Sequence, residues 1–303
     1  MATLAATAPR AMTTGLRKRK SPVGAIIGKI LFGLIVVVLF IYMVFPFYWA
    51  VLSALKAPAD ITSVSYWPSQ IYWGNLEYVF GNRDFLLALR NSAIVSVTSV
   101  AIALVLGAFS AYALGRMQFR GKSFVLYLIL SMTMFPAIAI LGALFKMVRG
   151  EWFLNTPNLY NTWWALIATY LTFTLPFTVW VLANFFRAMP GDLEQAALVD
   201  GATPFQAFRQ ILLPLALPGL VTTGLLAFIA AWNEFLFALT FTQDYSARTV
   251  QPAIASFSGR TQFDEPWGSI MAASVVVTVP LIVLVLIFQR KILAGLTAGA
   301  VKG

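Results

Sequence analysis

The sequence predicts an all-α integral membrane protein with six transmembrane helices, and three observations support this prediction. Hydrophobic residues make up 60% of the 303 residues and charged residues only 11%, against roughly 45–50% and 25% in soluble domains. Six stretches lack Asp, Glu, Lys and Arg, and each has about 20 or more largely apolar residues, enough to cross a hydrocarbon core about 30 Å thick. The Lys and Arg residues are also distributed unevenly between alternate loops. Lipid must therefore surround much of this chain.

The six helices are expected near residues 26–52, 90–114, 123–147, 162–186, 213–242 and 268–289. The first stretch is too long for a secretory signal and has no small-residue cleavage site. Pro136, Pro176 and Pro280 fall within predicted spans and should bend them. Residues 1–25 are rich in Ala and Thr and then basic, so we expect a disordered cytoplasmic tail. Residues 26–303 are expected to form one transmembrane domain.

The distribution of basic residues predicts the orientation of these helices. If the six helices cross in turn, fourteen of the 21 Lys and Arg residues lie on the side of the two termini and seven on the other side. Cytoplasmic loops of membrane proteins carry the excess of Lys and Arg. Both termini are therefore expected in the cytoplasm.

The composition excludes several classes of function. The chain has no Cys and no His, which excludes disulfides, most zinc and haem sites, and Ser-His-Asp or Cys-His catalysis. The net charge of +10 follows the loops rather than a nucleic-acid-binding face. Residues 115–123 look like a phosphate-binding loop, but five residues separate Gly115 from Gly121 where a Walker A motif has four. No catalytic residue, metal ion or cofactor is therefore expected in this chain.

The loop between the fourth and fifth predicted helices, residues 189–214, is the most informative segment. It is expected to form two short helices joined at Gly201, which suits the left-handed conformation that ends a helix. Asp192 is expected to cap the first helix, and Thr203 to cap the second in a capping box with Gln206. Taken alone, this hairpin could simply lie among the lipid headgroups on the cytoplasmic side.

Two features of the hairpin suggest contact with a partner. Apolar residues of the second helix fall on one stripe, and small residues in the first helix would allow close approach. The stripe comprises Phe205, Phe208, Ile211 and Leu212, and the small residues are Ala196 and Ala197.

The hairpin resembles the signature loop of ABC-importer permeases, which reads Glu-Ala-Ala, three residues, Gly, nine residues, Ile-x-Leu-Pro. The matching residues are Ala196, Ala197, Gly201, Ile211, Leu213 and Pro214. The sequence departs from the pattern at Gln195, which stands where the family has Glu, and an acidic residue precedes it at Glu194. In that family the loop is the coupling helix, which seats in a cleft of the ATPase subunit. The departure puts an ion pair expected of the family's Glu in doubt.

Other short motifs, in this order along the chain, resemble the second permease of maltose- and trehalose-type importers. They are Arg90-Asn91-Ser92, residues 111–116, Phe119-Arg120-Gly121-Lys122, Trp232-Asn233-Glu234-Phe235 and the ending 295–303. The resemblance implies a bacterial inner-membrane permease for an α-glucoside disaccharide such as trehalose or maltose. It implies as partners a second permease, two ATPase subunits that bind ATP and Mg, and an extracytoplasmic sugar-binding protein. This chain would not itself be an enzyme.

Two sets of candidate site residues follow. Those expected to couple to the ATPase are Glu194, Gln195, Ala196, Ala197, Asp200, Gly201, Phe205, Phe208, Ile211, Leu213 and Pro214. Those expected along the substrate path are Asn91, Trp232, Asn233 and Glu234. Glu234 is the only acidic residue inside a predicted span, where a carboxylate costs roughly 2.5–3.5 kcal/mol to insert. Glu234 could instead form a helix–helix hydrogen bond or contact the partner permease, and Asn91 could cap the second helix.

Four alternatives remain open from the sequence. An importer of glycerol-phosphate or another polyol would need a cation at mid-membrane, and none is predicted there. A self-contained secondary transporter would show matching interrupted halves, which the sequence lacks. An intramembrane enzyme lacks His and a second carboxylate beside Glu234. A structural membrane anchor would not explain the organised hairpin.

Overall fold

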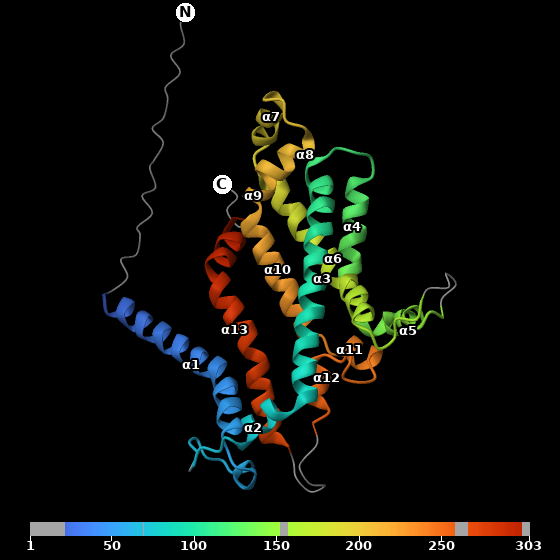
Figure 1. Cartoon of the computed structure of the whole chain (residues 1–303). Helices are drawn as coiled ribbons and strands as arrows, with labels where there is room; N and C mark the ends of the chain where they lie inside the picture. Colours follow the sequence, from blue (N-terminus) through green and yellow to red (C-terminus); the bar gives the residue numbers. More distant parts are fainter. Residues whose placement is uncertain (1–21, 69, 152–156, 258–265, 299–303) are drawn as a thin grey trace, which may run out of the picture. The chain divides into compact units, whose positions relative to one another are not determined.

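The computed structural model describes residues 22–68, 70–151, 157–257 and 266–298, and every regular element in these ranges is helical (Figure 1). The chain divides into two compact units, Met1–Trp49 and Ala50–Gly303. Most of the predicted tail, residues 1–21, lies outside the described residues. The helix that follows it begins at Pro22 rather than at residue 26.

The first unit contains most of α1 (Pro22–Ala54). Apolar side chains cover every side of this helix, and from residue 26 to residue 47 all of them are exposed. A helix that is hydrophobic all round is typical of a membrane span.

In the second unit, the long helices α3 (Arg83–Arg116), α6 (Trp163–Ala188), α10 (Leu217–Trp232) and α13 (Trp267–Ala298) run side by side (Figure 1). Small residues let α3 and α6 approach closely. A Cβ on Gly107 would lie 2.5 Å from Thr178 Cγ2, and one on Gly115 would lie 3.0 Å from the Ala183 carbonyl oxygen. Such contacts are typical of packed membrane helices.

Within the described residues, four helices are long and apolar enough to cross a membrane, and six spans result if each of two bent pairs counts as one. The predicted helices at 90–114, 162–186 and 268–289 are confirmed as α3, α6 and α13. Pro176 and Pro280 lie inside helices that continue past them.

The predicted third helix, 123–147, bends at Pro136 as expected, but it is wrong as a single helix. It consists of α4 (Lys122–Thr133) and α5 (Ala137–Val148), which meet at an angle of 95°. Pro136 sits at the break, where its ring and missing N–H prevent the helix from continuing. Twelve residues span only about 18 Å, so α4 alone is too short to cross a bilayer.

The predicted fifth helix, 213–242, is also interrupted. A 71° bend separates residues 204–215 from α10, and α10 stops at Trp232 before the short α11 (Leu236–Phe241). Outside the 192–215 segment, the remaining helices are η1 (Pro58–Asp60), α2 (Gly74–Gly81) and α12 (Val250–Ala255). In Figure 1, α2 and α12 lie toward the end of this unit opposite the 192–215 segment.

Candidate functional site

The hairpin forms as predicted at its turn and at its second cap. It consists of α7 (Asp192–Val199), α8 (Pro204–Ala207), the π-helical turn η2 (Phe208–Leu212) and α9 (Leu213–Leu215). Gly201 has a φ of +88°, the left-handed conformation expected of it. Gln206 N donates to Thr203 Oγ1 at 3.3 Å and Thr203 N donates to Gln206 Oε1 at 2.7 Å, which completes the capping box.

Two local predictions for the hairpin are wrong. Asp192 is the first residue of α7 and not its cap, because Gly191 already has helical dihedrals and occupies the capping position. Residues 205–212 do not form one regular helix, since the Leu213 N–H bonds the Phe208 carbonyl five residues back. Pro214 explains this wider turn, because it has no N–H and its ring crowds the carbonyl four residues earlier.

The predicted apolar stripe is consequently split between two sides of the hairpin. Phe205 is 57% exposed, whereas Phe208 is 3% exposed and Leu212 is fully buried. The ring centroid of Phe208 lies 4.8 Å from that of Tyr112 and 6.1 Å from that of Phe186. The expectation that Phe208 anchors a partner is therefore corrected: it fixes the hairpin to α3 and α6 of its own chain. Ala197 is buried too, which leaves Ala196 as the small residue on the outside.

Glu194 holds the first helix of the hairpin against the end of α3. Arg116 Nε donates to Glu194 Oε2 at 2.8 Å, and the Tyr112 hydroxyl donates to Glu194 Oε1 at 2.7 Å. Arg116 also donates to the carbonyl oxygens of Met189 at 3.0 Å and Pro190 at 3.3 Å. Both carboxylate oxygens of Glu194 are thus used within the chain, while Gln195 is exposed.

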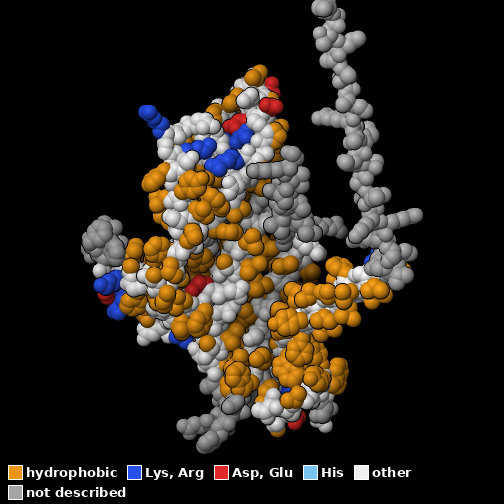
Figure 2. All heavy atoms as spheres, turned by 180° about the vertical axis from the view of Figure 1, so that it is seen from behind, with side chains coloured by type: hydrophobic (Ala, Val, Ile, Leu, Met, Phe, Trp, Pro, Cys, Tyr) orange, Lys and Arg blue, Asp and Glu red, His pale blue; other side chains and the backbone are white. Residues whose placement is uncertain are grey.

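Four large apolar side chains of α7 and α8 are exposed, namely Leu193, Leu198, Val199 and Phe205, and we refer to these four residues as the docking face. Val199 is 87% exposed. Sequence analysis identified only Phe205, because the other three lie off the stripe. Figure 2 shows acidic and basic side chains gathered at the hairpin end of this unit, with hydrophobic side chains over the helices beyond it.

Two of the substrate-path candidates are buried and bonded within the chain. Asn91 Nδ2 donates to the carbonyl oxygens of Tyr245 and Arg248, both at 3.0 Å. The Trp232 indole donates to the Val277 carbonyl oxygen at 3.3 Å, and its ring stacks on Phe228. In this conformation both side chains support the fold.

The other two candidates lie at the break between α10 and α11. Glu234 accepts hydrogen bonds from the backbone N–H groups of Phe237 at 2.8 Å and Ala238 at 3.0 Å, at the start of α11. Asn233 is exposed, and its amide donates to the Ile229 carbonyl oxygen at 2.9 Å. Glu234 therefore stabilises the break between α10 and α11. Of the four substrate-path candidates, Asn233 is the one whose side chain is exposed.

Hydrogen bonds from and to Asn161 hold the loop 242–249, and the sequence did not predict them. Asn161, at a φ of +58°, accepts from Gln243 N at 2.8 Å and donates to Asp244 Oδ2 at 3.0 Å. Hydrogen bonds from Ser246 lower the pKa of Asp244 below its ordinary value, with a smaller contribution from Asn161. These partners are 82 or more residues away from Asn161, so no local pattern indicates them.

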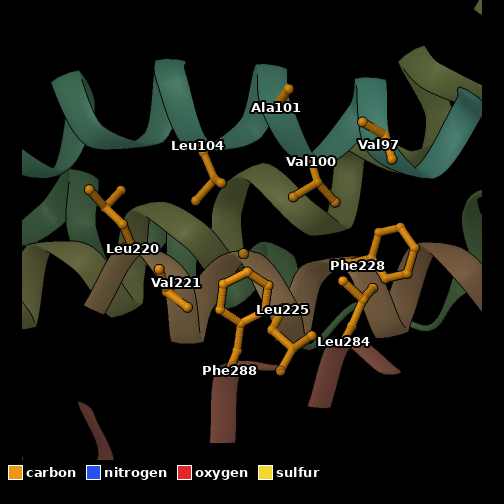
Figure 3. A pocket seen from close by; sticks show the side chains of 11 residues that line it. Val97, Val100, Ala101, Leu104, Leu220, Val221, Leu225, Phe228, Leu284 and Phe288 are labelled. Carbon is orange, nitrogen blue, oxygen red and sulfur yellow. The ribbon is translucent and has the colours of Figure 1, made fainter. Parts of the chain in front are cut away.

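One apolar cavity of about 460 Å³ lies between α3, α10 and α13 (Figure 3). Its lining residues are Val97, Val100, Ala101, Leu104, Leu220, Val221, Gly224, Leu225, Phe228, Leu284 and Phe288. With no polar side chain in its lining, this cavity cannot recognise a sugar by hydrogen bonds. Among the described residues, no group of acidic side chains is arranged to hold a metal ion.

Comparisons with known proteins identify the family. The model of the family "Binding-protein-dependent transport system inner membrane component" matches residues 103–297. The chain is 45% identical over 262 residues to the "Trehalose transport system permease protein SugB" of Mycobacterium tuberculosis, covering 86% of this chain and 93% of that protein. It is 40% identical over 284 residues to the "Trehalose/maltose transport system permease protein MalG" of Thermococcus litoralis, covering 92% and 96%.

A solved structure shares the fold. It is a bacterial ABC transporter involved in the import of the acidic polysaccharide alginate, and one of its chains matches with a TM-score of 0.75 and 19% identity. The match covers 89% of this chain and 98% of that one. The chain belongs to the binding-protein-dependent transport system inner membrane components, and within them it is a carbohydrate ABC transporter permease that spans the membrane several times.

Proposed function

We propose that this permease carries an α-glucoside disaccharide, trehalose or maltose, across a bacterial inner membrane. The observation that carries the proposal is the identity of 40% or more, over most of the chain, to two permeases named for these sugars. Glu234 is occupied by the backbone of α11, and Asn233 offers an exposed amide to a sugar hydroxyl at the same break. A mainly uncharged path of this kind favours a neutral sugar over a phosphorylated polyol.

The working unit we propose contains a second permease, two ATPase subunits and an extracytoplasmic binding protein. The family description itself names binding-protein-dependent transport. ATP and Mg would be held by the ATPase subunits, since residues 115–123 follow a membrane helix and lack Walker A spacing.

The hairpin is the proposed contact with the ATPase. Its docking face places the apolar Val199 and the aromatic Phe205 on the outside of a segment that its own chain fixes from within. A buried aromatic anchor is typical of the residues that dominate the energy of an interface. Gln195 and Asp200 are also exposed on the hairpin and would lie around this contact.

We further propose six spans with both termini in the cytoplasm. The α4–α5 pair supports six spans, because it leads from the C-terminal end of α3 to the start of α6. Lys122 donates to the Met117 carbonyl oxygen beside the hairpin end, whereas the Val148 carbonyl oxygen accepts from Leu159 N just before α6 begins. The excess of Lys and Arg on the hairpin side supports the cytoplasmic placement of that side.

The test is reconstitution of the complex in proteoliposomes with its partner permease, ATPase subunits and binding protein. We expect ATP-dependent uptake of labelled trehalose or maltose, and little uptake of glycerol-phosphate. Preferred uptake of a phosphorylated polyol would contradict the substrate assignment. Uptake without any ATPase subunit would contradict the importer mechanism.

A further inference from the structure

The join between α6 and the hairpin is a point where the chain could bend. Three residues, Met189-Pro190-Gly191, separate the end of α6 from the start of α7. Met189 is extended, with φ −71° and ψ +144°, and Pro190 cannot donate a backbone hydrogen bond. The covalent connection alone would therefore let the hairpin swing relative to α6.

Side chains of α3 bind residues on both sides of the connection between α6 and α7. Arg116 donates hydrogen bonds to the Met189 and Pro190 carbonyl oxygens before the hairpin and to Glu194 within it. Tyr112, one helical turn earlier on α3, supplies a second hydrogen bond to Glu194 and also packs its ring on Phe208. The hairpin is thereby tied to α3 at both of its helices.

The Arg116–Glu194 pair is shielded enough for this contact to be strong. The side chains are 11% and 19% exposed, with an N–O distance of 2.8 Å. The other ion pair in the described part of the chain, Arg149–Glu151, is 47% and 54% exposed. Exposed pairs contribute little because water and salt screen them, whereas shielded charge-assisted hydrogen bonds contribute more.

We propose that Arg116 and Glu194 are positioning residues that lock the hairpin to α3, so that the hairpin and the α3–α6 pair move as one body. This inference rests on the proposed function, in which the hairpin docks on the ATPase. Glu194 acts through the hairpin and touches neither ATP nor sugar. It corresponds to no letter of the signature pattern, which begins at Gln195.

The lock gives α3 contacts at both ends of the second unit. Residues 91 and 116 lie about 38 Å apart along a helix that rises 1.5 Å per residue. At the far end, Asn91 and Ser92 hold the backbone of Tyr245, Arg248 and Val250. A movement imposed on the hairpin therefore reaches the loop 242–249 through one continuous helix instead of being absorbed at the joint.

The test uses the complete reconstituted complex with Glu194→Gln, which keeps the shape of the side chain and removes its charge. Tyr112→Phe is the milder second variant, because it removes one hydrogen bond and keeps the ring on Phe208. Glu151→Gln is the matched control, because it neutralises the exposed ion pair. For each variant we would measure the retained ATPase subunits, the rate of ATP hydrolysis, and the sugar transported per ATP hydrolysed.

We expect Glu194→Gln to retain the ATPase and to hydrolyse ATP, while the sugar transported per ATP falls roughly tenfold, in line with the loss of a charged hydrogen bond. Tyr112→Phe should fall by a smaller factor, and Glu151→Gln should match the wild type. Spin labels at Asp200→Cys and Leu106→Cys, in the naturally Cys-free chain, should give a broader distance distribution with Glu194→Gln than without it.

Three outcomes would overturn the lock. The first is a wild-type transport ratio for Glu194→Gln, and the second is an unchanged distance distribution. The third is loss of the ATPase from Glu194→Gln alone, which would place Glu194 in the docking surface. Failure of the wild-type chain to retain any ATPase would instead refute the proposed function, so the two failures are distinguishable.

Discussion

Replacing Gly201 by Val tests whether the turn of the hairpin is needed for coupling. Gly201 has a φ of +88°, and a Cβ built there would meet no atom within 4 Å. The cost is therefore one of backbone conformation, without a clash. A residue other than Gly in the left-handed region costs about 1–2 kcal/mol, which lowers the population of the native turn by roughly 5- to 30-fold. A β-branched side chain lies at the upper end of this range.

The assay is sugar-stimulated ATP hydrolysis and transport by the reconstituted complex. Gly201→Val should lose most of both while the protein still inserts in the membrane. Gly201→Asn should retain most of them, because Asn tolerates the left-handed conformation. Gly121→Val is the matched control outside the hairpin, since Gly121 has a φ of +85° and equally open surroundings. Equal coupling in Gly201→Val and wild type would refute the reasoning, as would an equal loss in Gly121→Val.

Four further predictions follow from the same contacts. Phe205→Ala should weaken association with the ATPase at least about tenfold, as expected for an aromatic hot spot, and Phe80→Ala at the other end of the unit should not; equal retention in pull-downs would contradict this. Asn91→Ala should destabilise the chain by about 1–3 kcal/mol, because two partly buried backbone carbonyls lose their donor, and an unchanged thermal unfolding midpoint would exclude that role. Asn233→Ala should lower transport without changing the affinity of the binding protein for sugar, and a normal transport rate would remove Asn233 from the path. A Cys at position 199 should react with an impermeant reagent only in inside-out vesicles, and one at position 243 only in intact spheroplasts; the reverse pattern would invert the topology.

Composition and hydropathy predict the location of the spans well, because burial in lipid depends on the average polarity of a stretch. Composition and hydropathy do not predict where the helix axis bends within a span. The break at Pro136 and the break at residues 233–235 both lie in stretches whose hydropathy is that of a single span, and the chain turns by 95° at the first. A proline marks one break, but Pro176 and Pro280 lie in helices that continue. The difference depends on packing against other helices, which the local sequence does not contain.

The hairpin and the substrate-path candidates likewise combine features that the local sequence predicts with contacts that it does not predict. Gly201 and the Thr203–Gln206 box depend on neighbours within a few residues, and both were predicted correctly. The contacts of Glu194 with Tyr112 and Arg116 join residues 82 and 78 positions apart, and those of Asn91 reach 157 positions. The burial of Phe208 also depends on α3 and α6. Such contacts follow from the tertiary fold, so a stripe of apolar residues could not show which of its members faces inward.

The structure suggests a division of roles within the signature loop. Three of the positions that the pattern fixes serve the hairpin itself: Ala197 is buried against its own chain, Gly201 makes the turn, and Pro214 follows the wide π-helical turn. Three of the four residues of the docking face, Leu198, Val199 and Phe205, stand at positions that the pattern leaves free, and Leu193 precedes the pattern. In the proposed complex, the exposed apolar residues would have to fit the surface of the ATPase, whereas Ala197, Gly201 and Pro214 would maintain the shape of the hairpin. Selectivity for the ATPase should therefore reside at the free positions, with the fixed positions presenting them in a constant geometry.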